Sequence, residues 1–318
     1  MESTLAITAG KPALLADDEA LVVVDVGRAT IRVGVVTTDR SDEMERFQNA
    51  ILGKDPVAML ATLVRRAVPP GARLMGAVVG LPASFDAAGR RTLFSPRLPA
   101  LEGLCLGEEL GAVLGVPVVV EQDTVLLAVG EWAAGAGARA ESLLCVFIGA
   151  GIGGAMLFHG QPYHGASGSG VAVGHLPIRD HGRRCVCGNT GCLDAYASGR
   201  VLVEIAEAAG TTLENVFSHP EAQADIVDYL AALADGIVAA VSILDPKVLV
   251  LGGGIHGQPG FPRDALALRI VRGLRTPVLR ADMEIRSAAL GVDAALHAAP
   301  ILFARAMADD APGFGTTH

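Results

Sequence analysis

Three cysteines and one histidine form a compact group of possible metal ligands in the sequence. Cys185, Cys187 and Cys192 follow the pattern C-x-C-x4-C, and His175 lies a short distance upstream. Zn²⁺ prefers four nitrogen or sulfur ligands in a tetrahedron, and four protein ligands leave no open coordination position. The pattern therefore predicts a structural zinc knuckle over residues 175–194. The alternative is a set of three buried cysteines without a metal.

Two glycine clusters each follow an apolar run of residues. The first contains Gly149, Gly151, Gly153 and Gly154 within IGAGIGGAMLF, and the second occupies 252–254 in VLVLGGGI. Glycine permits backbone conformations that other residues rarely adopt. These clusters therefore predict tight turns, the first between two buried strands and the second after a strand.

One carboxylate comes at the end of a predicted strand, VPVVVEQD at 116–123. A carboxylate in that position, Asp123, can project into a cleft and act as a general base. A lone aspartate at a strand end is more often the cap of the following helix. The residue pattern alone leaves both interpretations open.

The composition predicts a folded cytoplasmic protein. Hydrophobic residues make up 51% of the 318 residues, which excludes a disordered chain, and the net charge of −9 argues against nucleic-acid binding by this chain itself. The uncharged stretch 142–178 has an apolar part of only about 17 residues. Glycines in its middle favour two buried strands over a membrane span. The first residues do not resemble a signal peptide, and in a reducing cytosol five cysteines favour a metal site over disulfides.

Apolar strands alternate with helical segments along the chain, which predicts an α/β protein. The stretches 22–36 and 143–157 share one design, in which a glycine turn joins two apolar strands. They predict two similar lobes with a boundary near 120–124. Helices are expected at 106–115, 200–209 and 222–244, and strands at 77–86, 116–123 and 247–255.

The chain resembles the ROK family of sugar kinases and sugar-responsive repressors, in motifs that cover almost its whole length. The residues that carry the resemblance are VVVDVGRATIRVGVV, GLPASFD, SPRLPALEGL, PVVVEQDTVLLAVGE, IGAGIGGAMLFHGQPYHGASG, the GH before CVCGNTGCLDAYAS, and VLVLGGGI. The resemblance implies an α/β protein with the two-lobed actin-like ATPase (ribonuclease H-like) fold. It implies a lead-in at 1–19, an N-terminal lobe at 20–120, a C-terminal lobe at 121–290, and a C-terminal helix at 291–310 that packs back onto the first lobe.

The resemblance also implies roles for residues of a cleft between the lobes. Asp123 would be the general base of a kinase, taking a proton from the sugar hydroxyl that attacks the γ-phosphate of ATP. The residues expected to contact the sugar are Pro82, Gln122, Asp123, His175 and Asp194. Those expected to bind ATP with Mg²⁺ are Asp25, Gly27, Gly149, Gly151, Gly153, Gly252, Gly253 and Gly254. His175 would then be shared between the metal and the pocket, and the family resemblance further implies a homodimer.

Several residues depart from the kinase pattern in these motifs. Arg28 replaces the second glycine of the first phosphate turn, where it can either bind phosphate or block the site. Ala172 replaces a glutamate that accepts hydrogen bonds from the sugar, and Val125 replaces an asparagine. The other departures are Ala83, Gln122, Ala150 and Asp194. Because each lost buried acceptor is worth roughly 1–3 kcal/mol, we expect weak hexose binding or a different ligand.

These departures favour a sugar-responsive transcriptional-regulator core that binds a sugar or sugar phosphate and has weak or no kinase activity. The lead-in AGKPALLADDEA resembles the linker that joins a repressor's winged helix-turn-helix to this core, and no such domain fits before residue 10. An ordinary disordered terminus is the other interpretation of the lead-in. The alternative functions are an ATP-dependent kinase of hexoses or amino sugars, with Asp123 as base, and a scaffold without a small ligand.

Overall fold

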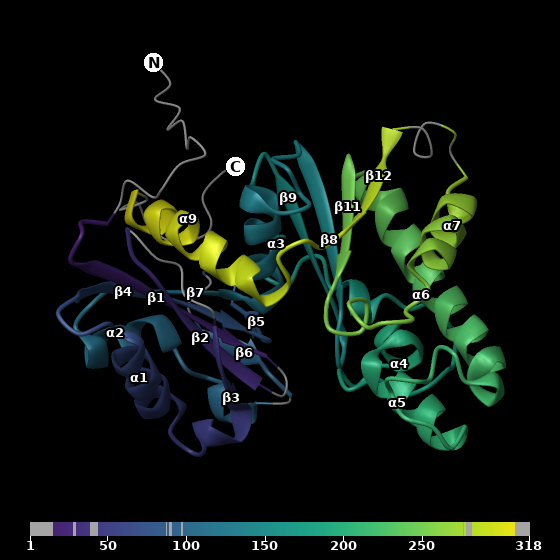
Figure 1. The fold of residues 1–318 in the computed structure, drawn as a ribbon, viewed down its shortest axis with the longest axis horizontal. Coiled ribbons are helices and arrows are strands. Elements are labelled where there is room, and N and C mark those ends of the chain that lie inside the picture. Colours follow the sequence, from purple (N-terminus) through teal and green to yellow (C-terminus); the bar gives the residue numbers. More distant parts are fainter. Residues whose placement is uncertain are drawn as a thin grey trace.

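The computed structural model describes residues 15–27, 30–38, 44–86, 88, 91–96, 98–275, 277 and 282–308. In this part of the chain, two five-stranded sheets lie side by side, each with helices on its outer face, and two helices pack between them (Figure 1). Each sheet with its outer helices is called a lobe below. Arg28 and most of the predicted lead-in lie outside the described residues.

The first sheet has the strand order β3-β2-β1-β4-β7. Its strands are β1 (Glu19–Val26), β2 (Thr30–Val36), β3 (Glu45–Gln48), β4 (Arg73–Leu81) and β7 (Val118–Gln122). The helices and short elements of this lobe are η1 (Asn49–Leu52), α1 (Pro56–Ala67), β5 (Ser84–Phe85), β6 (Thr92–Phe94), η2 (Pro99–Leu101) and α2 (Leu106–Leu114). The first three strands are antiparallel, whereas β4 pairs parallel with both β1 and β7.

The second sheet repeats this plan with the order β10-β9-β8-β11-β12. Its strands are β8 (Ser142–Ile148), β9 (Ile152–Phe158), β10 (Gln161–Pro162), β11 (Val248–Gly252) and β12 (Glu284–Ser287). The helices of this lobe are η3 (Val173–His175), α4 (Asp194–Ala197), α5 (Gly199–Ala208), η4 (Pro220–Ala222), α6 (Gln223–Leu244) and α7 (Arg263–Gly273). Again an antiparallel set comes first, and β11 pairs parallel with β8 and β12.

Strand alternation explains why the apolar runs fold into sheets that are covered on both faces. Successive side chains of a strand point to opposite faces. Thus Val22 and Val24 of β1 pack under α1 and α2, whereas Leu21 and Val23 face the layer between the sheets. The residues of β8 divide in the same way between this layer and the helices of the second lobe. Near-continuous apolar strands are typical of sheets that are buried on both faces.

The layer between the sheets is formed by α3 (Asp123–Ala134) and α9 (Ala294–Ala308), which pack along each other. The approach is close enough that a Cβ at Gly130 of α3 would overlap the backbone of Ala294. Figure 1 shows α9, near the end of the described chain, lying over the first sheet. The short turn η5 (Gly291–Asp293) leads into it.

Most predicted elements are confirmed, with small shifts at their ends. Both hairpins are present, so the uncharged stretch from residue 142 forms β8 and β9. The strand expected at 116–123 ends at Gln122. The next residue, Asp123, has helical backbone geometry and is the first residue of α3. The described C-terminal helix covers 294–308, within the expected 291–310. The lobe boundaries themselves stay a prediction.

One segment, Pro220–Leu244, is long and apolar enough to cross a membrane by length and composition. In this structure 56% of its most apolar 18-residue stretch is buried, and it packs against the second sheet and its neighbouring helices. A central helix of a protein core passes the same test of length and hydropathy, and α6 has the position of such a helix.

Candidate functional site

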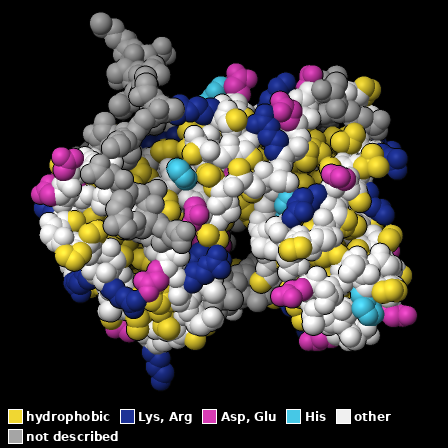
Figure 2. All heavy atoms as spheres, viewed as in Figure 1, with side chains coloured by type: hydrophobic (Ala, Val, Ile, Leu, Met, Phe, Trp, Pro, Cys, Tyr) yellow, Lys and Arg dark blue, Asp and Glu magenta, His cyan; other side chains and the backbone are white. Residues whose placement is uncertain are grey.

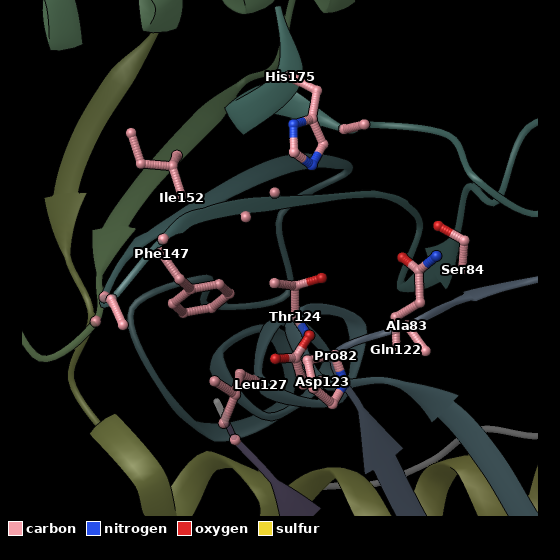
Figure 3. Close-up of a pocket in the computed structure, with 18 of the residues that line it drawn as sticks. Pro82, Ala83, Ser84, Gln122, Asp123, Thr124, Leu127, Phe147, Ile152 and His175 are labelled. Atoms are coloured by element: carbon pink, nitrogen blue, oxygen red, sulfur yellow. The ribbon is translucent and has the colours of Figure 1, made fainter. Parts of the chain in front are cut away.

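A cleft of about 400 Å³ is lined by residues of both lobes and of α3 (Figure 3). From the first lobe come Gly27, Thr30, Arg32, Pro82, Ala83, Ser84, Phe94 and Pro96. The residues at and after the end of β7 are Gln122, Asp123, Thr124 and Leu127. From the second lobe come Phe147, the turn 149–154, Ser169, Gly170, Val171, Ala172, His175, Val186, Gly253 and Gly254. The structure therefore brings together segments that are far apart in the sequence.

Most of the residues predicted for the site line this cleft. For the sugar these are Pro82, Gln122, Asp123 and His175, and for the phosphates they are Gly27, Gly149, Gly151, Gly153, Gly253 and Gly254. Three predicted residues, Asp25, Asp194 and Gly252, are not part of the lining. The functional roles of all these residues stay predictions.

Asp123 starts α3 at the point where the first sheet ends. Its Oδ1 accepts a hydrogen bond from the backbone N–H of Thr124 at 2.8 Å. Figure 3 shows Asp123 and Thr124 on the side of the cleft opposite His175. A carboxylate in this place can accept a proton from a ligand hydroxyl held between the two sides.

Gln122 is fixed by a contact across the two lobes. Its side-chain Nε2 donates a hydrogen bond to the carbonyl oxygen of Gly168 at 3.0 Å. The preceding Glu121 is buried, and its Oε2 lies 2.9 Å from Nε2 of His164 in the loop after β10. Burial alone would lower the pKa of His164, but the hydrogen bond and the charge of Glu121 together raise it. The end of β7 is therefore joined to the second lobe by two contacts.

The two glycine turns of the second lobe adjoin each other. The N–H of Gly149 donates to the carbonyl of Gly151 at 2.9 Å, which closes the first turn, and the N–H of Ile255 donates to Ile148 at 2.9 Å. Gly253 has φ +95°, and a Cβ there would overlap the backbone of Ile148. A side chain at Gly153 would likewise meet that of Thr124. Glycine is needed at these positions for the turns to approach each other and α3.

Asp25 is paired with a basic residue that the sequence analysis did not single out. Its Oδ2 lies 2.6 Å from NH1 of Arg32, which is directly opposite on β2. Asp25 is only 2% exposed. Burial raises the pKa of the Asp25 carboxyl, and the charge and hydrogen bond of Arg32 oppose this shift in part. An arginine within the apolar run TIRVGVV was the available sequence signal for this pair.

Asp194 lies behind the cleft rather than in its lining. It is fully buried, its Oδ1 accepts a hydrogen bond from the N–H of Ile152 at 2.8 Å, and its Oδ2 lies 3.6 Å from NH2 of Arg200. These contacts attach α4 to the start of β9. The geometry gives no support to a direct sugar contact by Asp194. Gly252 is likewise packed, because a Cβ there would meet Ala288 and Phe147.

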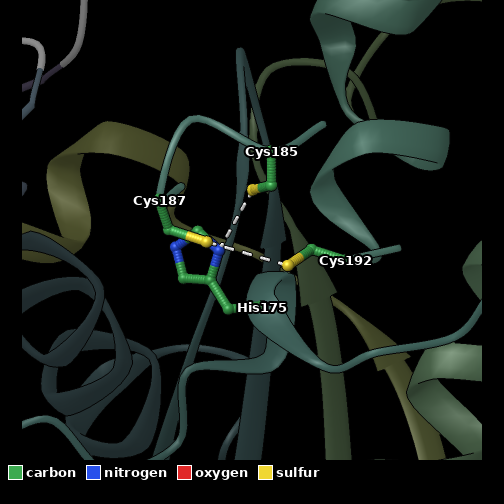
Figure 4. Close-up of side chains that lie close together, drawn as sticks. All are labelled: His175, Cys185, Cys187 and Cys192. Carbon is green, nitrogen blue, oxygen red and sulfur yellow. Dashed lines mark hydrogen bonds between the residues drawn. The ribbon is translucent and has the colours of Figure 1, made fainter. Parts of the chain in front are cut away.

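The predicted metal ligands lie together at the edge of the cleft (Figure 4). One ligand atom from each of His175, Cys185, Cys187 and Cys192 lies within 4.8 Å of the others. The Sγ of Cys185 is 3.5 Å from Nδ1 of His175, and the Sγ atoms of Cys187 and Cys192 are 3.7 Å apart. Tetrahedral zinc with its usual bond lengths places two sulfurs about 3.8 Å apart and a sulfur and a nitrogen about 3.6 Å apart. The four residues therefore fit a tetrahedral ion such as zinc.

Comparison of the sequence with known proteins gives one family, and the similar curated proteins include both sugar kinases and a putative xylose repressor from Caldicellulosiruptor. The model of the ROK family matches residues 21–306. Among curated proteins, the chain is 29% identical to a glucokinase of Thermotoga maritima, over 74% of this chain and 82% of that enzyme.

Comparison with solved structures shows the fold. A ROK family glucokinase from Streptomyces griseus, in complex with glucose and AMPPNP, superimposes with a TM-score of 0.79 at 24% identity, over 89% of this chain and 98% of that one. A ROK family transcriptional regulator, a homologue of the E. coli MLC protein, gives a TM-score of 0.77 at 20% identity, over 90% of this chain and 78% of that one. The expected actin-like α/β fold is confirmed.

Proposed function

Because this chain belongs to the ROK family, we propose that it binds a sugar in its cleft as a sugar-responsive regulator core with weak or no kinase activity. One observation carries the proposal. Ala172 lines the cleft in the position where the resemblance implies a glutamate that accepts hydrogen bonds from the sugar. Discrimination between sugars depends on such buried hydrogen bonds, so their loss is expected to weaken hexose binding, and with it hexose phosphorylation, or to favour a different ligand.

The proposed response is a change in the arrangement of the lobes. A sugar that contacts Gln122 and Asp123 on one side of the cleft and His175 on the other would bind best when the two sides are close together. A ligand shifts such an equilibrium only by its difference in affinity between the open and closed states. A DNA-binding domain attached to this core would then respond to the sugar through the lobe arrangement.

An ATP-dependent sugar kinase is the second candidate, and the relatives favour it. The similar proteins from Thermotoga maritima and Streptomyces griseus are both described as glucokinases. Asp123 lies in the cleft opposite His175, where it could accept the proton of an attacking sugar hydroxyl. In this candidate function ATP would supply the phosphoryl group, and the glycine turns would hold its phosphates.

A coupled assay with ATP and Mg²⁺ against hexoses, amino sugars and pentoses separates the two functions. Turnover above about 1 s⁻¹, the usual lower range of kinases, that is abolished in Asp123→Asn would establish the kinase and contradict the regulator core. The regulator core predicts slower or no turnover. It also predicts that at least one sugar raises the melting temperature of the protein.

Zinc is proposed as the resident ion of the Cys–His site. The distances between ligand atoms match a tetrahedron, and three thiolates with one imidazole are a common donor set for structural zinc. Nδ1 of His175 faces the cysteines, while Figure 3 shows the ring in the wall of the cleft. An ion bound there would fix the orientation of this ring toward the ligand.

Location and assembly are proposed from surface charge and from the family. The net charge of −9 and the mixing of acidic and basic side chains on the face shown in Figure 2 give no basic patch for nucleic acid on that face. A cytoplasmic homodimer that binds DNA only through a further domain is consistent with the family. Size-exclusion chromatography with light scattering tests the dimer.

A further inference from the structure

The ion pair of Arg32 and Asp25 changes the charge of the cleft. The two residues are cross-strand partners on β1 and β2, and the 2.6 Å contact joins the buried carboxylate to the guanidinium. Arg32 lines the cleft, whereas Asp25 does not. A Cβ at Gly27 would lie 3.5 Å from NH1 of Arg32, so the guanidinium packs against the Gly27 turn. The carboxylate is thus covered by a cation on the side of the cleft.

The carboxylates available for a divalent cation are correspondingly few. Among the described residues that line the cleft, Asp123 is the sole carboxylate. Mg²⁺ in phosphoryl-transfer sites is usually held by one or two carboxylates together with the substrate phosphates. An ion at the buried Asp25 carboxylate would have to compete with its contact to Arg32. The Mg²⁺ position that the resemblance implies at Asp25 therefore does not fit these residues.

Arg32 keeps hydrogen-bonding capacity that its contact with Asp25 does not use. Its Nε is buried and has no hydrogen-bond partner among the described residues. A guanidinium presents five N–H donors in a planar fork that matches phosphate oxygens. The glycine turns at 149–154 and 253–254 line the same cleft and offer backbone amides. The cleft therefore holds a guanidinium and backbone amides whose N–H groups can donate to a phosphate group.

We propose that Arg32 takes the place of a divalent cation, so that the cleft binds the phosphate groups of a nucleotide or a sugar phosphate without Mg²⁺. The inference rests on the proposed function only in taking the cleft as the ligand site. Phosphoryl transfer depends on neutralisation of charge by Mg²⁺. A cleft of this kind retains phosphate recognition and loses efficient transfer.

Isothermal titration calorimetry of the full chain tests the proposal with ADP, glucose 6-phosphate and inorganic phosphate, each in EDTA and in excess MgCl₂. We expect at least one of the three to bind in EDTA with an affinity equal to or higher than in MgCl₂. The ligand that binds best identifies the source of the phosphate. Binding that is about tenfold or more tighter with MgCl₂ overturns the proposal, as does the absence of binding by all three in both buffers.

Two substitutions separate the roles of the paired residues. Asp25→Asn removes the carboxylate and leaves Arg32, so we expect binding in EDTA to be kept or strengthened. If Asp25 were an Mg²⁺ ligand, the same substitution would abolish binding that depends on MgCl₂. Arg32→Gln should weaken binding in EDTA by about tenfold or more, because a charge-assisted contact is lost.

Arg46→Gln is the matched control, since Arg46 lies opposite Arg32 on β3 but is exposed and outside the cleft lining. It removes the same charge and should leave binding unchanged. Circular dichroism checks that each variant is folded. If Arg32→Gln does not fold, ligand binding by Asp25→Asn in EDTA and in MgCl₂ decides whether the proposal holds. A titration with unphosphorylated sugars in EDTA tests the proposed function separately. Sugar binding can be absent while phosphate binding is retained, so the two proposals can fail independently.

Discussion

Nε2 of His164 lies 2.9 Å from Oε2 of Glu121, and this contact joins the loop after β10 to the end of β7. Glu121 immediately precedes the cleft residues Gln122 and Asp123. The carboxylate also accepts a hydrogen bond from the N–H of Gln122 through Oε1 at 2.7 Å. The pair therefore couples the position of a second-lobe loop to the backbone that presents the proposed sugar-binding residues.

The stability provided by this pair should depend on pH. Although burial opposes it, the hydrogen bond and charge of Glu121 raise the pKa of His164 above its ordinary value of 6.5. The protonated form is thus favoured in the folded state, so its contribution is fully present below pH 6.5 and is lost as the pH rises through the folded-state pKa. Urea unfolding should show wild type more stable than His164→Gln by about 1.5–3 kcal/mol at low pH, with the difference shrinking at higher pH.

His181→Gln serves as the control for this series, because the His181 side chain is 94% exposed. It should change stability little at any pH. A wild-type advantage over His164→Gln that grows with rising pH would contradict the assigned direction of the pKa shift.

Purified protein should contain one zinc ion per chain by elemental analysis. Cys192→Ser removes a ligand of the proposed tetrahedron, so the metal content should fall well below one and the melting temperature should drop. Cys105→Ser is the matched control, because Cys105 lies outside the cluster at the start of α2. Zinc-free protein with intact thiols, or a metal content that Cys192→Ser leaves unchanged, would rule out zinc at this site.

Gly130→Ala should destabilise the fold although it improves the helix propensity of α3. In a free helix this change is favourable by about 1 kcal/mol. Here the added Cβ would overlap the backbone of Ala294, and overpacking of this kind costs about 1–3 kcal/mol or more. The cost of the steric overlap should therefore exceed the gain in helix propensity, and chemical denaturation should show a lower free energy of unfolding for Gly130→Ala. Gly257→Ala meets only an ordinary contact at 3.4 Å and should be close to neutral.

Short-range patterns predicted much of this structure. The apolar runs within 22–36 and 143–157 determine two hairpins locally, because a glycine turn of only a few residues joins the two runs of each pair. The ligands Cys185, Cys187 and Cys192 are close in sequence, so their convergence could also be predicted. Motif resemblance then placed Asp123 and His175 at one cleft, although Asp123 begins α3 after a strand of the first sheet and His175 lies in η3 of the second lobe.

Contacts between distant side chains could not be predicted in this way. The pairing of Asp25 with Arg32 depends on the register of β1 and β2, which in turn depends on how many residues the turn contains. His164 and Glu121 are 43 residues apart and meet only through the packing of the lobes. The N–H of Ile152 likewise donates to Asp194, which lies 42 residues further along the chain.

Restoring a carboxylate at residue 172 should strengthen sugar binding. Ala172 lines the cleft and is exposed, so a glutamate can be accommodated and can accept hydrogen bonds from ligand hydroxyls. A gain of about 1–3 kcal/mol corresponds to roughly 5- to 150-fold tighter binding, because 1.4 kcal/mol is tenfold. Calorimetric titration of Ala172→Glu with glucose and with N-acetylglucosamine measures the change in affinity.

Ala166→Glu, on the same loop but outside the lining, adds the same charge and should have no effect. Equal affinities for wild type and Ala172→Glu would mean that the missing carboxylate does not limit recognition of these sugars. The case for a regulator core based on this residue would then fail.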